Sequence, residues 1–488
     1  MSLEKNQVLK LTAISLFLIN LFMGLFFINE GLFHADSVAL AQAVEKTYQT
    51  GQLQPAANGR YGAVIVNSML YFPAYLFGFN ADFITRFSSI LFHALSIVAL
   101  FLFIYELFEN EIQAVLGALL LSFTPFYFSP NTYGKEHGMS LFFLLMSFYI
   151  VVRRGVKKES SLWLALASFL YVLSASVRES ILITIPLYFL LYFYPEFSFR
   201  PFKIVIPKER FNWKILCSFA LPLLGGIGII YFSYLHNTFK QLSISMEYRG
   251  LFSYILKMAL EDLFMGLPTP LFVLLILGII EMVRKGKHFL AVFLLLWTMS
   301  IFYYGNINLY CLRYLDVVII PIYIFVAYFL AILHEKYGLV AKFFILYFVW
   351  NMIMLMYPML EFRHQYNGEK HFALFVQANT EPNALILTRD DSSFIQYYGH
   401  RETCYFPLEY DKPEHFIKEV EGSLRQHRPV YYTYIALDKI YEKVSFLRMR
   451  RYFNMQLVGE AISEDYHRPE LEFQLYHQKL FKVNLRNH

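Results

Sequence analysis

Long apolar runs recur through most of this 488-residue chain, and they restrict the folds that it can adopt. Only 16% of its residues are charged, whereas soluble proteins carry about 25%. A helix that crosses a bilayer needs ~20 apolar residues. We therefore predict a multi-pass, all-α membrane bundle. Runs near this length predict about eleven transmembrane helices, at 11–30, 86–107, 112–129, 137–152, 161–176, 180–195, 215–235, 265–283, 288–304, 315–334 and 339–360.

The first run also resembles a secretory signal peptide, because Lys5 and Lys10 precede it and "ALA" at 39–41 follows it. Its length is nearer the ~20 residues of a spanning helix than the ~7–15 of a signal core. Cleavage at "ALA" would also fall after charged residues, well beyond the run. We expect the run to be retained as the first transmembrane helix.

The distribution of basic residues predicts the orientation of the helices. With the N-terminus in the cytoplasm, the cytoplasmic segments hold sixteen Lys and Arg residues and the opposite segments hold nine. The positive-inside rule favours this arrangement, which places the C-terminal part outside a plasma or inner membrane. The basic loops account for the net charge of +5, so no nucleic-acid partner is required.

The sequence changes character after residue 360. Residues 361–488 contain 17 basic and 18 acidic residues. Short runs at 384–388, 430–435 and 471–476 predict strands, and the apolar spacing in 412–427 predicts a helix. We therefore predict a transmembrane domain at 1–360 and an extracytoplasmic soluble α/β domain at 361–488.

Asp36 lies just beyond the first run, and apolar residues on helical spacing follow it. One interpretation is a helix N-cap, because Asp and Ser are preferred immediately before a helix. The other is a catalytic carboxylate at the outer membrane surface. His34, two residues earlier, is a candidate for binding an acceptor or a metal ion.

Lys135, Glu136 and His137 gather at the predicted outer end of the fourth run. Charges are costly in hydrocarbon, so such a cluster faces either water or a protein cavity. A solvated loop with a snorkelling lysine is the first interpretation. The second is a carboxylate and an imidazole that face the same cavity as Asp36 and suit a divalent metal ion or an acceptor hydroxyl.

Two arginines are predicted at other outer turns. Arg178 can pair with Glu179, and Arg313 can pair with Asp316. Each can instead bind phosphate, because a guanidinium holds phosphate through a bidentate fork. Lys135 is a third candidate phosphate ligand. The predicted topology brings these distant segments to one face, and this convergence favours a shared site.

The order of these features resembles the polyprenyl-phosphate-sugar glycosyltransferases of the GT-C fold. The similarity is greatest to the branch of protein O-mannosyltransferases and the aminoarabinose transferase that modifies lipid A. That family has an Asp after its first span, often followed by Glu; Asp36 matches the Asp, and Ser37 replaces the acid. A Leu-Tyr pair, Gly78 and Arg86 match a family patch, although its paired prolines are missing here.

The later motifs extend the resemblance over most of the chain. Glu136 matches an acidic residue before the fourth span, and Arg178 matches a basic residue after the fifth. The family's "RYLxxxxP" signature is matched from Arg313 to Pro321, and its outer soluble domain by "ALILTRDDSSFIQYYGHRETCYF" at 384–406. The resemblance implies a GT-C-like bundle with an outer α/β domain. It also implies transfer of a sugar from a polyprenyl-phosphate donor to a glycan, lipid or protein acceptor, with Asp36 as catalytic base.

Two other function classes stay open at this point. A transporter or lipid flippase also has an apolar bundle. Transporters commonly show internal repeats and polar residues near mid-membrane. In this sequence the charges gather at the outer ends of the predicted helices instead. A glycosyltransferase-like protein without activity is the third interpretation, because Ser37 stands where the family has an acid.

The predicted orientation can be tested by labelling. Cysteines introduced into the basic segments 153–158 and 200–214 should react only with reagents that reach the cytoplasm, and cysteines after Glu361 only from outside. Cytoplasmic labelling of the C-terminal part would contradict the shared outer face.

Overall fold

The computed structural model describes residues 2–56, 60–156, 160–199, 202–207, 212–232, 261, 263, 267–300, 315–388, 392–405, 413–435, 441–467 and 472–486. The chain forms two compact units. The first, called here the helical unit, comprises Met1–Ile28 and Ala43–Pro358. The second, the α/β unit, comprises Asn29–Gln42 and Met359–His488. The predicted boundary between residues 360 and 361 stays a prediction.

The helical unit has a helix at each predicted apolar run within its described part. Two helices continue into the α/β unit, namely α2 (Ala35–Thr50) and α17 (Gly338–Gln365). A short hairpin of β1 (Glu196–Phe199) and β2 (Phe202–Val205) separates α9 from α10. The remaining elements are α1 (Ser2–Phe26), α3 (Gly62–Tyr75), α4 (Ala81–Phe108), α5 (Glu111–Ser122), α6 (Pro125–Thr132), α7 (His137–Ile150), η2 (Val151–Val156), α8 (Ser161–Val177), η3 (Glu179–Thr184), α9 (Ile185–Phe193), α10 (Trp213–Ile230), α13 (Pro270–Arg284), α14 (His288–Thr298) and α16 (Asp316–Lys336).

Among the described residues, five helices are long and apolar enough to cross a membrane, or six if a bent pair counts as one span. The chain is thus a multi-pass membrane protein, and the count of eleven spans stays a prediction. The run at 112–129 does not form one straight helix, because α5 and α6 meet at an angle of 60°. Pro125 explains this break: proline lacks the N–H that would continue the helix, and it is favoured at the start of a new one.

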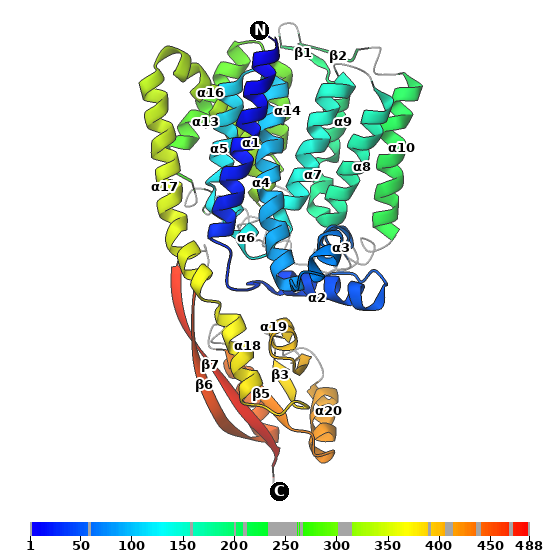
Figure 1. The fold of residues 1–488 in the computed structure, drawn as a ribbon, viewed down its shortest axis with the longest axis vertical. Coiled ribbons are helices and arrows are strands. Elements are labelled where there is room, and N and C mark those ends of the chain that lie inside the picture. Colours follow the sequence, from blue (N-terminus) through cyan, green and yellow to red (C-terminus); the bar gives the residue numbers. More distant parts are fainter. Residues whose placement is uncertain are drawn as a thin grey trace. The chain divides into compact units, whose positions relative to one another are not determined.

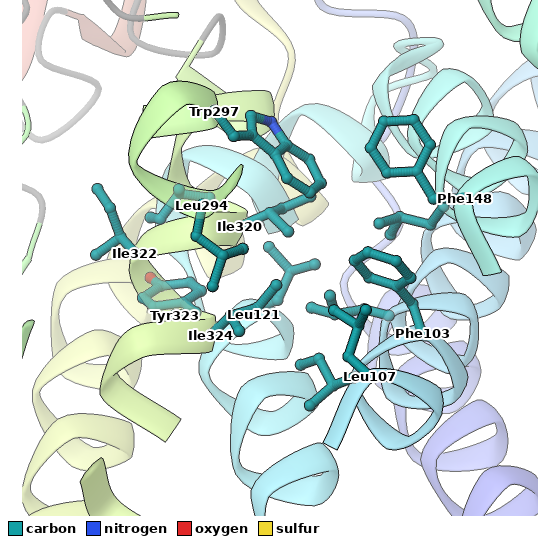
Figure 2. Close-up of a cluster of buried hydrophobic side chains, with 14 of the residues drawn as sticks. Phe103, Leu107, Leu121, Phe148, Leu294, Trp297, Ile320, Ile322, Tyr323 and Ile324 are labelled. Atoms are coloured by element: carbon teal, nitrogen blue, oxygen red, sulfur yellow. The ribbon is translucent and has the colours of Figure 1, made fainter. Parts of the chain in front are cut away.

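The core of the helical unit lies where α4, α5, α7, α14 and α16 meet (Figure 2). Trp297 of α14 is fully buried, and its ring lies 5.3 Å from that of Phe148 in α7, centroid to centroid. Residues 317–327 of α16 are all buried, because this helix is apolar on every side. Packing of this kind holds transmembrane helices together, since lipid supplies little hydrophobic force between them.

The two ends of the helical unit are different (Figure 1). The N-terminus and the β1–β2 hairpin lie at one end, and α3 and α6 lie at the other. Residues 1–10 and 196–214 were predicted to share the cytoplasmic side, and the described parts of both lie at the same end. The turns that carry the predicted site residues follow α6 and α8.

The α/β unit contains a five-stranded mixed sheet in the order β4-β3-β5-β7-β6. β3 (Leu385–Thr388) pairs in parallel with β4 (Glu402–Tyr405) and β5 (Val430–Ile435), and β7 (Glu472–Leu485) pairs antiparallel with β5 and β6 (Phe453–His467). The unit's further helices are α18 (Gly368–Ala378), α19 (Ser392–Tyr397), α20 (Pro413–Arg425) and α21 (Tyr441–Tyr452). The predicted strands and the helix in 412–427 are therefore confirmed.

Candidate active site

The turn between α6 and α7 carries three predicted site residues. Lys135, Glu136 and His137 are buried, with exposed fractions of 1%, 6% and 2%. Gly134 begins the turn with φ of +89°, a conformation that favours glycine because it has no Cβ. The prediction of a solvated loop is therefore wrong, and these charges face the interior of the protein.

Arg60 holds this turn to a second one. Its Nη1 donates a hydrogen bond of 2.9 Å to Glu136 Oε1. Its Nε and Nη2 donate bonds of 2.8 and 2.7 Å to the two carboxylate oxygens of Glu179. This bidentate geometry is the strongest form of an arginine–carboxylate pair. One largely buried guanidinium thus connects Glu136 and Glu179, which are 43 residues apart in sequence.

The surrounding charges determine the ionisation of Glu136. Burial alone would raise its pKa, but the positive charges of Lys135 and Arg60 outweigh burial and lower the pKa to about 2. A carboxylate with so low a pKa stays ionised at neutral pH and accepts a proton poorly. Its charge is suited to holding cations in place.

Arg178 lies in a second buried network. Its Nη1 donates a hydrogen bond of 2.6 Å to Asp316 Oδ2. Nδ1 of His137 lies 2.8 Å from the same oxygen and 2.7 Å from Arg178 Nη1. The other oxygen, Oδ1, accepts a bond of 2.8 Å from the backbone N–H of Val317. Asp316 is fully buried and connects the start of α16 with the turns before α7 and η3.

The structure therefore joins three of the four predicted segments, those around residues 135–137, 178–179 and 316. Arg178 pairs with Asp316, and Glu179 pairs with Arg60. Arg313 lies outside the described residues, so its predicted roles in phosphate binding and in pairing with Asp316 stay predictions.

Asp36 and His34 belong to the α/β unit. α2 begins at Ala35, so Asp36 lies inside the first turn and does not precede the helix. The cap is supplied by His34, because its Nδ1 accepts a bond of 3.2 Å from the backbone N–H of Asp36, and its carbonyl accepts from Ser37. About a third of each of the two side chains is exposed. The Asp36 carboxylate is thus not the N-cap of this helix.

The described residues of this site do not fit a metal ion. Among the described residues, no group of three or more His, Cys, Asp or Glu side chains could hold one. Nδ1 of His137 also lies 2.7 Å from the Arg178 guanidinium, whose positive charge would repel a cation. No step below depends on a metal.

Sequence reasoning assigned no role to Arg60 and treated Asp316 only as a partner of Arg313. One signal could have identified Arg60. It is one of only nine basic residues in the predicted outer segments that precede residue 361, where the positive-inside rule expects few.

Glu136 makes the stability of the helical unit depend on pH. Its pKa in the folded protein is about 2, below the ordinary value of 4.5. The ionised carboxylate therefore contributes its full stabilisation above about pH 4.5, and this contribution falls as the pH drops toward 2.

In detergent, Glu136→Gln should lower the melting temperature at pH 7. It should also make the melting temperature fall less between pH 7 and pH 3 than it does in wild type. Glu421→Gln, which breaks an exposed pair with Arg425, is the control. A Glu136→Gln curve parallel to wild type would contradict this linkage.

Comparison with known proteins supplies the context for these networks. The family model described as dolichyl-phosphate-mannose-protein mannosyltransferase matches residues 63–203. This segment includes the turns that carry Glu136 and Arg178. No protein of curated function shows significant sequence similarity to the chain.

Solved structures of membrane glycosyltransferases have a similar fold. ArnT from Cupriavidus metallidurans in the apo state is 12% identical, with 99% of this chain and 98% of that chain covered and a TM-score of 0.59. ArnT bound to undecaprenyl phosphate is 10% identical, with 97% of each chain covered and a TM-score of 0.56. The Archaeoglobus fulgidus oligosaccharyltransferase is 12% identical, with 94% of this chain and 72% of that chain covered and a TM-score of 0.58. The chain therefore has the GT-C fold of membrane glycosyltransferases, which confirms the resemblance found in its sequence.

Proposed function

We propose that this protein transfers a sugar from a polyprenyl-phosphate donor to an acceptor hydroxyl at the outer face of a cell membrane. The acceptor is a glycan, a lipid or a protein. The observation that carries the proposal is the largely buried charged cluster of the helical unit, in which Arg60, Lys135 and Arg178 are gathered with the carboxylates of Glu136, Glu179 and Asp316. Burying so many charges costs free energy, and sites of this kind mark substrate binding more often than stability.

Arg178 is the proposed ligand of the donor phosphate, with Lys135 and Arg313 beside it in this role. A guanidinium has five N–H donors in a rigid fork, so one arginine can hold Asp316 and contact a phosphate at the same time. Asp316 fixes the direction of that fork through a bond of 2.6 Å. One similar protein, ArnT from Cupriavidus metallidurans, has been solved with undecaprenyl phosphate bound, which supports a lipid-phosphate ligand for this fold.

Asp36 is the proposed general base. Its side chain is about one-third exposed and lies next to His34, whose ring nitrogen accepts a hydrogen bond from the Asp36 backbone. The sugar phosphate is already a good leaving group, so the protein's tasks are to position the donor and to activate the acceptor. A carboxylate takes the hydroxyl proton as the acceptor oxygen attacks the anomeric carbon. Attack from the face opposite the phosphate inverts the configuration at that carbon.

Glu136 and His137 are proposed to position the site. Glu136 accepts a hydrogen bond from Arg60 and is next to Lys135 in the sequence. His137 contacts both Arg178 and Asp316. The two side chains thus keep the proposed phosphate ligands in place. An acceptor-binding role for His137 or His34 rests on the sequence prediction alone.

Asp36→Asn should reduce sugar transfer by about two orders of magnitude, because Asn has nearly the same shape but cannot take up the proton. The measurement is transfer from radiolabelled polyprenyl-phosphate sugars to extracted acceptors. The variant should still insert into membranes and still bind the donor. Transfer at the wild-type rate would exclude Asp36 as the base. Stable donor binding without hydrolysis or transfer by the wild-type protein would favour a transporter or flippase.

Arg178→Lys and Arg313→Lys should each weaken donor binding by about tenfold, because an ammonium cannot reproduce the forked contact with phosphate. The measurement is the Kd for undecaprenyl phosphate in detergent. Arg401→Lys is the matched control: Arg401 is also largely buried, but its guanidinium donates to backbone carbonyls inside the α/β unit. An unchanged Kd in both test variants would remove the arginines from the donor site.

A further inference from the structure

The segment that carries Asp36 is held by the α/β unit. Residues 29–42 belong to that unit although they follow α1 directly in sequence. The contacts concentrate on three consecutive residues, Glu30, Gly31 and Leu32, and their partners are more than 330 residues away in the chain. Residues 30–32 together with these partners are called here the clasp.

Glu30 supplies the charged part of the clasp. Its Oε1 accepts a hydrogen bond of 3.2 Å from Lys370 Nζ. Its Oε2 accepts a bond of 3.0 Å from the backbone N–H of Asn367 and lies 3.0 Å from His371 Nε2. Partial burial raises the pKa of this carboxyl, and the contacts with His371 and Lys370 more than offset that effect, so the pKa is lowered.

The backbone of the clasp is also fixed in position. The N–H of Glu30 donates to the Arg363 carbonyl at 3.1 Å. The N–H of Leu32 donates to the Tyr398 hydroxyl at 2.9 Å, and its carbonyl accepts a bond of 3.0 Å from Asn367 Nδ2. Two side chains of the α/β unit thus bind both polar groups of one peptide backbone, and the segment has a single register.

Gly31 lies where the segment after α1 closely approaches residues 367–398 of the α/β unit. A Cβ at this position would lie 3.0 Å from Lys370 Cδ and from the Tyr398 hydroxyl, and 3.2 Å from Asn367 Nδ2. These separations are below ordinary van der Waals contact, so a Cβ here would displace these side chains by a few tenths of an ångström. Glycine lets the segment and its partners approach this closely.

We infer that Glu30, Asn367 and Tyr398 are positioning residues that determine where the Asp36 carboxylate stands. This inference rests on the proposed function, in which Asp36 is the base. Asp36 follows Leu32 by four residues, and the cap of α2 at His34 lies between them. The α/β unit then fixes the segment that carries the proposed base. A small displacement of a reacting group costs up to about 100-fold in rate, because the alignment of the reacting atoms is lost.

Loss of the clasp should not unfold the unit that provides it. The core of the α/β unit is formed by other residues, among them Leu387, Val420, Val430 and Tyr432. The variants below therefore change the position of the segment while this core is retained.

The first variant is Glu30→Gln, which turns one acceptor oxygen into an NH2 group that opposes the donors around it. Its control is Glu460→Gln, because Glu460 contacts the same residue types, His477 at 2.6 Å and Lys479 at 3.5 Å, between β6 and β7. In the full-length protein, Glu30→Gln should lower kcat for sugar transfer by about 10- to 100-fold and change the KM for the donor by less than about twofold. Glu460→Gln should leave both constants unchanged.

Hydrogen exchange supplies a readout that does not depend on activity. In Glu30→Gln the backbone amides of residues 30 and 32 should exchange about tenfold faster than in wild type, because their partners move away. Amides in β3 and β5 should keep their protection. Gly31→Ala should show the same pattern, whereas Gly422→Ala, where a Cβ meets open space, should not.

The outcomes separate this inference from the proposed function. Wild-type kcat in Glu30→Gln and Gly31→Ala, or equal losses in their controls, would overturn the positioning role. If Asp36→Asn transfers sugar at the wild-type rate, the proposed function fails, and faster exchange of residues 30 and 32 in Glu30→Gln would still establish the clasp. Unchanged exchange at these amides would refute the clasp itself.

Discussion

The charges buried at the start of α16 depend on one carboxylate, that of Asp316. It accepts a hydrogen bond from Arg178, lies 2.8 Å from His137 and accepts a bond from the backbone at the start of α16. An ion buried without a partner costs several kcal/mol, so none of these groups can be buried alone. Residues 317–327 of α16 are apolar on all sides and are buried. This part of the helix can be buried because Arg178 neutralises the charge of Asp316, the first residue of α16.

The same constraint explains the pairing of the remaining charges. Arg60 connects Glu136 with Glu179 through one hydrogen bond to Glu136 and a forked pair to Glu179, so apolar packing is not the only contact that holds the two turns. Pairs of this kind are weak as a source of stability but strong as a source of specific geometry. They establish which turns meet and in what register. A phosphate group that entered this region would find cations already directed by their carboxylate partners.

Helices and strands that follow from the pattern of residues near one another in the sequence could be predicted. Apolar runs located the helices, alternating residues located β3 and β5, and the spacing of Phe416, Ile417 and Val420 located α20. The long-range pairs could not be predicted in this way. Asp316 was assigned to Arg313, three residues away, but its partner Arg178 is separated from it by 138 residues. Arg60 lies in a polar loop without periodicity, and only the fold shows that its partners are Glu136 and Glu179.

The contrast between two carboxylates indicates how the roles divide. Glu136 is buried among cations that lower its pKa to about 2, which keeps it ionised at neutral pH and makes it a poor proton acceptor. Asp36 is one-third exposed, stands beside a histidine and belongs to a segment that the α/β unit holds by the backbone. A general base has to take up a proton near the working pH, whereas a positioning group must stay charged. The environment of Glu136 therefore suits an anchor for cations, and Asp36 is the base that we propose. The hydrogen bonds to residues 30–32 fix the backbone just before the helix that carries Asp36.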